Sequence, residues 1–331
     1  MKTFARLAFF LAVSTAQAAV APAPDWKALN AESIALYRQG DVNGAMLTGA
    51  KAIEAAAAQL GPDNPAVATV VSNVARMMDI SGHDADAEAL YRRALAIREK
   101  ALGPDHLEVA STLNNLGSVL REQGKAAEAA PYFERALAIR EKALDPGNVD
   151  VAASLNNLAV TYRALGRYAE AEPLYLRSLK IREKATGPES AEVGATLHNL
   201  AALYDAQGQF DKAEPIYRLA LDVRRRALPA DDLDLAATLS GLGELYLATH
   251  NADKALPLLQ QSLAIRDKRL PAKHPDLLAA RRDLYAAHAS RGEFALAEQY
   301  AGEGQVTVSE EQRRRLSIPI PSAGMSPTRL Q

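Results

Sequence analysis

Apolar positions recur along most of the chain at three- and four-residue spacing, in pairs of segments separated by a glycine. Within residues 107–144, Leu113 and Leu116 mark the first segment, Gly124 interrupts the pattern, and Phe133 lies in the second. This spacing places apolar side chains on one face of an α-helix. Glycine is favoured where a helix ends in the left-handed conformation. Each such stretch therefore predicts a helix, a turn and a second helix.

The helix–turn–helix pattern repeats every 42 residues. One marker is the run Leu113-Asn114-Asn115-Leu116, which returns as Leu155-Asn156-Asn157-Leu158 and Leu197-His198-Asn199-Leu200. A second marker in the same register comprises Gly40, Gly82, Gly124, Gly166, Gly208 and Gly292, with His250 at the remaining position. A repeat that cannot bury its apolar face alone must stack on its neighbours. We therefore predict an all-α protein in which about seven antiparallel helix pairs form an α-solenoid over residues 29–301, the first and last pairs being degenerate.

The repeat resembles the tetratricopeptide repeat (TPR) family, in the 42-residue variety found in kinesin light chains. Three segments carry the resemblance: Leu155-Asn156-Asn157-Leu158, Ala171-Glu172-Pro173-Leu174-Tyr175 and Ile181-Arg182-Glu183-Lys184. The resemblance implies a right-handed superhelix whose first helices line a concave groove. It also implies a role in binding other proteins.

Composition removes several other classes of function. The 331 residues carry a formal net charge of −2, which does not suggest nucleic-acid binding by bulk electrostatics. The absence of cysteine excludes disulfides, cysteine-ligated metals and a cysteine nucleophile. No phosphate loop, nucleophile elbow or dinucleotide motif is present, and the six histidines are scattered. We therefore expect a protein that is not an enzyme and that uses no metal or cofactor.

The repeated asparagines are the predicted binding residues. By the family resemblance, the second asparagine of each dipeptide faces the groove, which would stack one amide per repeat. An amide both donates and accepts hydrogen bonds, so such a ladder suits an extended peptide backbone. The alternative is that these amides link neighbouring first helices or merely mark the family consensus, and a binding and a structural role can hold at once. The predicted set is Asn73, Asn115, Asn157 and Asn199, together with the first asparagines Asn114 and Asn156; Gly241 and Asp283 break the series.

Arginines near this ladder are candidates for selectivity. Arg76, Arg121 and Arg163 lie in the earlier repeats, and Asp205 and Glu244 in later ones. One hypothesis is a groove that runs from basic to acidic and prefers a peptide acidic at one end, since arginine suits carboxylates. The alternative is that these charges are solvated and unselective.

A different arginine column runs along the ends of the second helices. Most of its members precede an acid, so we expect surface charge ladders between repeats, worth about 0–1 kcal/mol each. The column comprises Arg98, Arg140, Arg182, Arg224 and Arg266.

The two ends of the chain lie outside the repeat. Residues 1–18 have the layout of a secretory signal peptide: Lys2 and Arg6, a short apolar run, and a small-residue site ending at Ala18. We therefore expect export to the bacterial periplasm, with cytoplasmic location as the alternative. Residues 19–28 would form a linker. Residues 302–331 would form a largely disordered extension.

The resulting functional hypothesis is a non-enzymatic scaffold that binds a peptide or protein segment in the groove of the solenoid. The alternative is a regulatory or targeting subunit of a separately encoded enzyme. No transmembrane segment and no nucleic-acid partner are expected. Pairing of two copies through a terminal repeat is left open, because the degenerate end repeats can either cap the array or pair.

Overall fold

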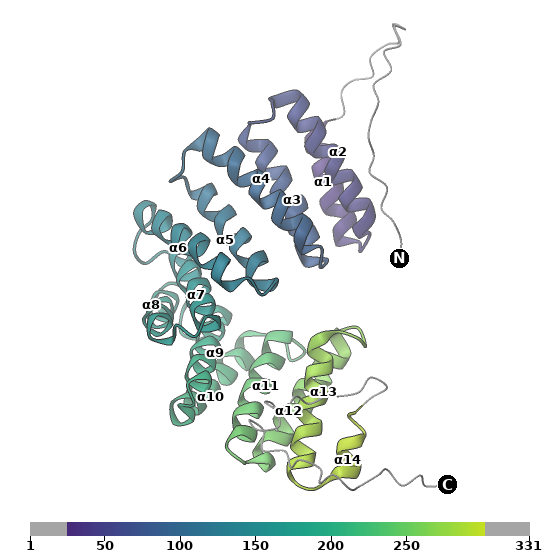
Figure 1. Ribbon diagram of the computed structural model, residues 1–331, viewed down its shortest axis with the longest axis vertical. Coiled ribbons are helices and arrows are strands. Elements are labelled where there is room, and N and C mark those ends of the chain that lie inside the picture. Colours follow the sequence, from purple (N-terminus) through teal and green to yellow (C-terminus); the bar gives the residue numbers. More distant parts are fainter. Residues whose placement is uncertain (1–24, 302–331) are drawn as a thin grey trace, which may run out of the picture. The chain divides into compact units, whose positions relative to one another are not determined.

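The computed structural model describes residues 25–301, so the predicted signal peptide, the C-terminal extension and most of the linker lie outside the described residues. This part of the chain is helical and contains no strand (Figure 1). The helices are α1 (Trp26–Arg38), α2 (Val42–Leu60), α3 (Pro65–Ile80), α4 (Asp84–Leu102), α5 (Leu107–Glu122), α6 (Ala126–Ala143), α7 (Val149–Ala164), α8 (Tyr168–Thr186), α9 (Ala191–Ala206), α10 (Phe210–Ala227), α11 (Leu233–Ala248), α12 (Ala252–Arg269), α13 (Pro275–Ser290) and α14 (Phe294–Glu298).

The helices pack as consecutive pairs in two compact units. Unit 1 ends at Pro104 and contains α1–α4; unit 2 begins at Asp105 and contains α5–α14. Within unit 2, each odd-numbered helix packs on the even-numbered helix that follows, and that helix packs on the first helix of the next pair. The predicted all-α fold of stacked antiparallel helix pairs is confirmed. Its right-handed superhelical path stays a prediction.

The first helix of each pair begins with a side-chain cap. Asn148 accepts a hydrogen bond from the backbone N–H of Asp150 at 2.8 Å. His106 and His274 do the same for the residue two positions on, through Nδ1 at 3.2 Å. Such caps satisfy N–H groups that have no partner inside the helix. Two of the six histidines are therefore helix caps.

The turn between the two helices of a pair uses a left-handed residue. Among the described residues, His250 is the one non-glycine residue with positive φ, at 58°. A side chain at positive φ is uncommon, and histidine tolerates it better than most residues. The other members of this column are glycines with φ between 70° and 85°: Gly40, Gly82, Gly124, Gly166, Gly208 and Gly292.

Small residues on one helix make room for large residues on its partner. A Cβ added to Gly117 of α5 would lie 2.9 Å from the Phe133 ring of α6. A Cβ added to Gly243 of α11 would lie 2.7 Å from Leu259 of α12. Phe133 and Leu259 are fully buried, as are Tyr175 and Tyr217 on α8 and α10. The core of each pair is thus built by interlocking a small column with a large one.

The arginine column on the second helices does not form the surface charge ladders that we expected. Arg224 is only 3% exposed, and its Nη1 donates to the backbone oxygen of Asp234 and to Thr238 Oγ1, both at 2.6 Å. Arg140 and Arg182 donate in the same way to the first helix of the next pair. These guanidinium groups, buried at Arg140 and Arg224 and half-buried at Arg182, join consecutive pairs through mainly neutral acceptors.

Candidate functional site

The asparagines on the first helices meet in pairs across consecutive repeats. Asn157 Nδ2 of α7 donates to Asn114 Oδ1 of α5 at 2.8 Å, and Asn199 Nδ2 of α9 donates to Asn156 Oδ1 of α7 at 3.1 Å. Each bond joins the second asparagine of one repeat to the first asparagine of the repeat before it. The structure therefore shows that these amides link neighbouring first helices, as one of the two readings of the sequence predicted.

Linking the helices leaves part of each amide pair open. Asn114, Asn156, Asn157 and Asn199 are half-buried, and none of their amide atoms is both enclosed and without a partner. A pair joined by one hydrogen bond keeps one carbonyl oxygen and several N–H groups that reach solvent. We call the half-buried stripe of unit 2 that carries these pairs the Asn face. It also contains Asn115, Ser118, Arg121, Val160, Arg163 and Ala202.

Asn73 belongs to unit 1 and makes the same kind of contact there. Its Nδ2 donates to Asn30 Oδ1 on α1 at 3.2 Å. Asn30 stands at the position of the first asparagine but belongs to the degenerate first repeat, where no Asn-Asn dipeptide marks it. Asn30 lies 42 residues before Ser72, which in turn lies 42 residues before Asn114. This register could have identified Asn30 from the sequence.

The asparagine series ends at α11, as the sequence predicted. A Cβ on Gly241 would lie 2.9 Å from the Tyr217 ring, so the aromatic ring fills the space beside the glycine. The imidazole of His198 packs edge-on against the same ring, with centroids 5.6 Å apart. Burial lowers the pKa of His198 to about 3, with Arg224 and Arg163 adding to the effect, so this histidine is neutral at physiological pH.

The three arginines predicted to give selectivity do not form one group. Arg76 is exposed on α3 in unit 1 and stands one helical turn away from the position of the other two. Arg121 and Arg163 stand at the same position of α5 and α7, where both are half-buried. Burial lowers the pKa of Arg121, the nearby Glu122 and Tyr175 oppose this fall, and Arg163 adds to it. Only Arg121 and Arg163 are therefore brought together.

The acidic residues of the later repeats also separate. Asp205 on α9 stands at the position of Arg121 and Arg163, whereas Glu244 on α11 stands at that of Arg76. Asp283 on α13 replaces the second asparagine and is 4% exposed. Burial raises the pKa of Asp283 to about 6, against the opposing influence of Arg282 and Arg266.

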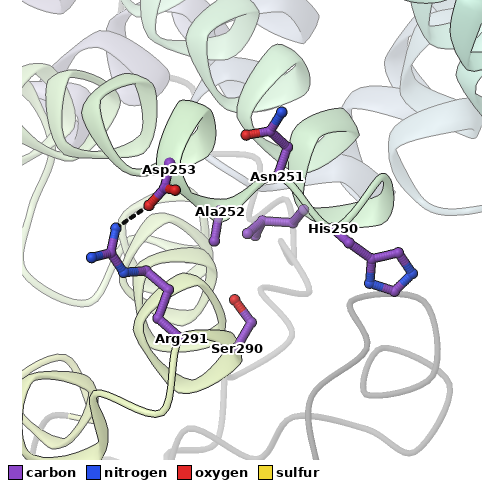
Figure 2. Close-up of a pocket in the computed structure, with 7 residues that line it drawn as sticks. His250, Asn251, Ala252, Asp253, Ser290 and Arg291 are labelled. Atoms are coloured by element: carbon purple, nitrogen blue, oxygen red, sulfur yellow. Dashed lines mark hydrogen bonds and ion pairs between the residues drawn. The ribbon is translucent and has the colours of Figure 1, made fainter.

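A small pocket lies between the α11–α12 turn and the C-terminal end of α13 (Figure 2). It has a volume of about 210 Å³. Arg291 forms an ion pair with Asp253 across it and donates to Glu293 Oε1 at 2.8 Å. Because its charged side chains bind each other, this pocket is a weaker candidate for a binding site than the Asn face. Its lining residues are Leu247, His250, Asn251, Ala252, Asp253, Ser290 and Arg291.

Among residues 25–301, no group of three or more histidine, aspartate or glutamate side chains is arranged to hold a metal ion. No helix in the same range combines the length and apolarity needed to cross a bilayer.

Stacked helix pairs with polar side chains along one face define a helical-repeat protein. The family profile of the tetratricopeptide repeat matches residues 28–100, 84–142, 150–226 and 234–304. The chain belongs to the tetratricopeptide repeat family. Proteins of this family are generally non-catalytic scaffolds for protein–protein interaction.

Solved structures agree with this assignment. A Podosopora anserina protein with nearly identical kinesin-light-chain TPR-like repeats is 26% identical, with a TM-score of 0.50 over 64% of this chain and 96% of that one. BtubC (BKLC) from P. vanneervenii is 22% identical, with a TM-score of 0.52 over 81% of this chain and 96% of that one. The apo form of RapI is 16% identical, with a TM-score of 0.65 over 88% and 98%. The last two similarities concern the fold alone. A comparison with curated protein sequences found no match.

Proposed function

We propose that this protein is a non-enzymatic scaffold that binds an extended peptide segment of a partner protein along the Asn face of unit 2. The observation that supports this proposal is the pair of amide bridges, Asn157 to Asn114 and Asn199 to Asn156. Both bridges lie between first helices, at residues that are half-buried.

The amide pairs suit a peptide backbone because they are fixed in place. Each pair is held by its own internal hydrogen bond, so little side-chain freedom remains to be lost when a ligand binds. The remaining carbonyl oxygen and N–H groups match the alternating N–H and C=O groups of an extended chain. Small neighbours such as Val160 and Ala202 leave room for a backbone to approach. Recognition of this kind is tolerant of sequence.

The test is site-specific photo-crosslinking of the full chain in its natural host. A photoreactive amino acid replaces Ala202 on the Asn face, and a matched variant carries it at Lys180, which is exposed on α8. We expect partner segments to be crosslinked from position 202 and not from position 180, as identified by mass spectrometry. Equal capture from both positions would contradict binding along the Asn face.

The identity of the captured material separates the two functional hypotheses. Segments from several proteins would support a peptide-binding scaffold. One enzyme captured in stoichiometric amount would instead support a regulatory or targeting subunit. Adding Asn157→Ala and Asn199→Ala to the position-202 variant should weaken capture in either case, since both use the same amides.

We also propose that the chain is exported to the periplasm through residues 1–18. The support is the basic start, the apolar run and the small-residue site that ends at Ala18. N-terminal sequencing of the protein from fractionated cells tests this proposal. A periplasmic protein that begins at Ala19 is expected, and a cytoplasmic protein with Lys2 intact would refute it.

A further inference from the structure

The last repeat of unit 2 has a much shorter second helix than the repeats before it. α14 spans five residues, whereas α6, α8, α10 and α12 each span 18 or 19. At about 1.5 Å per residue, α14 extends over about 7 Å and α13 over about 24 Å. Because a short turn joins the two helices, α14 lies beside the C-terminal part of α13 (Figure 1). The N-terminal part of α13 is therefore left without a second helix among the described residues.

The uncovered part of α13 is apolar. Leu278 is 48% exposed, whereas Ala236, at the same repeat position of α11, is 0% exposed. In that earlier pair α12 covers the position, since Ser262 Oγ donates to the backbone oxygen of Ala236 at 2.8 Å. The corresponding residues of α5 and α7, Ala110 and Ala152, are buried as completely. Leu278 therefore occupies a position that a complete second helix would bury.

Tyr285 extends this apolar surface along the helix. It lies seven residues after Leu278, so two helical turns place both side chains on one face of α13. Tyr285 is half-buried and stands at the repeat position of Gly243. Arg281 lies between them but reaches towards α12, where its Nη2 donates to Asp267 Oδ1 at 3.0 Å. We call the surface formed by Leu278 and Tyr285 the open face of α13.

The chain leaves α14 within reach of this open face. The ring of Tyr300 stacks on the imidazole of His288, near the C-terminal end of α13, with centroids 5.6 Å apart. Leu278 lies about 15 Å from His288 along the helix. The six residues from Tyr300 to Val306 span up to about 20 Å when they are extended. The segment 302–311 lies outside the described residues, but its valines can reach the open face.

The sequence after Ala301 favours an extended segment over a continued helix. Gly302 and Gly304 would lose more backbone freedom in a helix than any other residue type. Val306 and Val308 are β-branched and flank a threonine. This alternation of apolar and polar residues is typical of an extended segment with one buried side. The two valines would therefore point to the same side.

The charges of the segment complement those near the N-terminal end of α13. Glu310 and Glu311 follow the valines. Arg269 ends α12, Lys273 lies in the loop before α13, and both are exposed. Asp276 is the one acid in the first turn of α13, so these two cations outnumber it. Attraction between exposed charges is weak, so it orients the segment while the valines supply most of the contact.

We propose that residues 305–311 bind to the open face of α13 in extended form, with Val306 and Val308 against Leu278 and Tyr285. The segment closes the last repeat of unit 2 in place of a complete second helix. Its tether gives it a high effective concentration, which favours it over a second copy of the chain. Closure also hides an apolar surface that would otherwise promote association between copies. This inference concerns the end of unit 2 and does not depend on the Asn face.

Disulfide scanning of the full chain tests the contact, because the sequence contains no cysteine. Leu278→Cys is combined in turn with Gln305→Cys, Val306→Cys, Thr307→Cys and Val308→Cys. We expect the disulfide within one chain to form several-fold faster from positions 306 and 308 than from 305 and 307. The reason is that alternate residues of an extended segment point to opposite sides. Non-reducing electrophoresis and mass spectrometry measure the yield.

A matched control measures chance encounters of a tethered segment. Gln260→Cys replaces Leu278→Cys in the same series, since Gln260 is exposed on the neighbouring helix α12. Its disulfide yield should be low and equal for all four positions. Circular dichroism establishes that each variant keeps its helices.

Hydrogen exchange gives a second measurement, on chains without cysteine. Val306→Asp together with Val308→Asp should release the segment, because a carboxylate does not enter an apolar contact. The backbone amides of residues 275–285 should then exchange about tenfold or more faster. Thr307→Asp places its charge on the solvent side and should change these rates by less than about twofold.

Three results would overturn the inference. Equal disulfide yields from positions 305 to 308, with unchanged hydrogen exchange in the double aspartate variant, would show that the segment does not bind the open face. The highest yields at positions 305 and 308, three residues apart, would indicate a helix instead of an extended segment. A disulfide that joins two chains, with a dimer detected by light scattering, would assign the open face to a second copy.

Discussion

Two neighbouring joints of unit 2, meaning the contacts between the first helices of consecutive repeats, have different side chains at the same repeat positions. Between α7 and α9, Asn199 donates to Asn156 across the repeat boundary. Between α9 and α11, the corresponding positions hold Gly241 and His198, and the Tyr217 ring fills the space between them. The first joint is polar and keeps open amide groups. The second is aromatic, with a neutral histidine.

Both joints nevertheless stack in the same way. Each is also joined by an arginine from the second helix: the half-buried Arg182 at the first and the buried Arg224 at the second. The amide bridge is therefore not required for stacking, because packing and the arginine contacts are common to both joints. Asparagine at α7 and α9 therefore leaves open amide groups at this position, whereas α11 has none there.

The largest expected effect comes from removing the aromatic ring of the second joint. Tyr217→Ala should lower the free energy of unfolding by about 3–5 kcal/mol, because Tyr217 is 2% exposed and nothing can refill the space. Urea denaturation followed by circular dichroism measures the change. A loss below about 1 kcal/mol would show that the ring does not hold this joint together.

A third joint, between α11 and α13, should respond to pH. The pKa of Asp283 is raised from 3.8 to about 6, so its ionised form is disfavoured in the folded state. Its contribution is therefore most favourable below pH 4 and is lost as the pH rises through 6. Asp283→Asn should raise the free energy of unfolding by up to about 3 kcal/mol at pH 7.5 and by almost nothing at pH 4. Equal gains at both pH values would contradict the assignment.

Converting the aromatic joint into a polar one should fail. Gly241→Asn would supply an amide within reach of His198, but its Cβ would meet the Tyr217 ring at 2.9 Å. Overpacking of this kind costs about 1–3 kcal/mol, which exceeds the gain from one hydrogen bond. The melting temperature should therefore fall. An unchanged or higher melting temperature would mean that the ring moves aside freely.

The smallest expected effect comes from removing the amide bridge. Asn199→Ala deletes one half-buried hydrogen bond and should lower the free energy of unfolding by about 1 kcal/mol. The free energy of peptide binding, measured on the same variant, should weaken by more than the free energy of unfolding does. A loss of stability above about 3 kcal/mol with unchanged affinity would assign Asn199 a purely structural role.

Most of the fold could be predicted from the sequence because its contacts recur. Leu113, Gly124 and Phe133 mark one helix pair, and residues of the same kinds recur at 42-residue intervals. An interpretation of one repeat therefore holds for the whole array. The candidate binding residues were harder to place. Nearness to the asparagines grouped Arg76 with Arg121 and Arg163, although the 42-residue register places Arg76 at the position of Ser118, one helical turn before that of Arg121.

The arginine column shows a similar limit. The sequence suggests surface charge ladders at Arg140, Arg182 and Arg224, because each lies near acids. In the structure these side chains turn inward and donate to Ser154, Thr196 and Thr238. The partners are 14 residues away, across a turn whose geometry is set by the next helix.

The sequence by itself determined the helix pairs, their number and register, and the point at which the asparagine series ends, because each depends on local periodicity or on residue identity. Only the tertiary structure decided which amides bond to one another, which arginines of the second helices donate to the next repeat, and that Tyr175 lies near Arg121 and Arg163. These features depend on distances between side chains that lie far apart in the sequence, 43 residues in the case of the amide bridges. Such distances are set by how one repeat packs on the next.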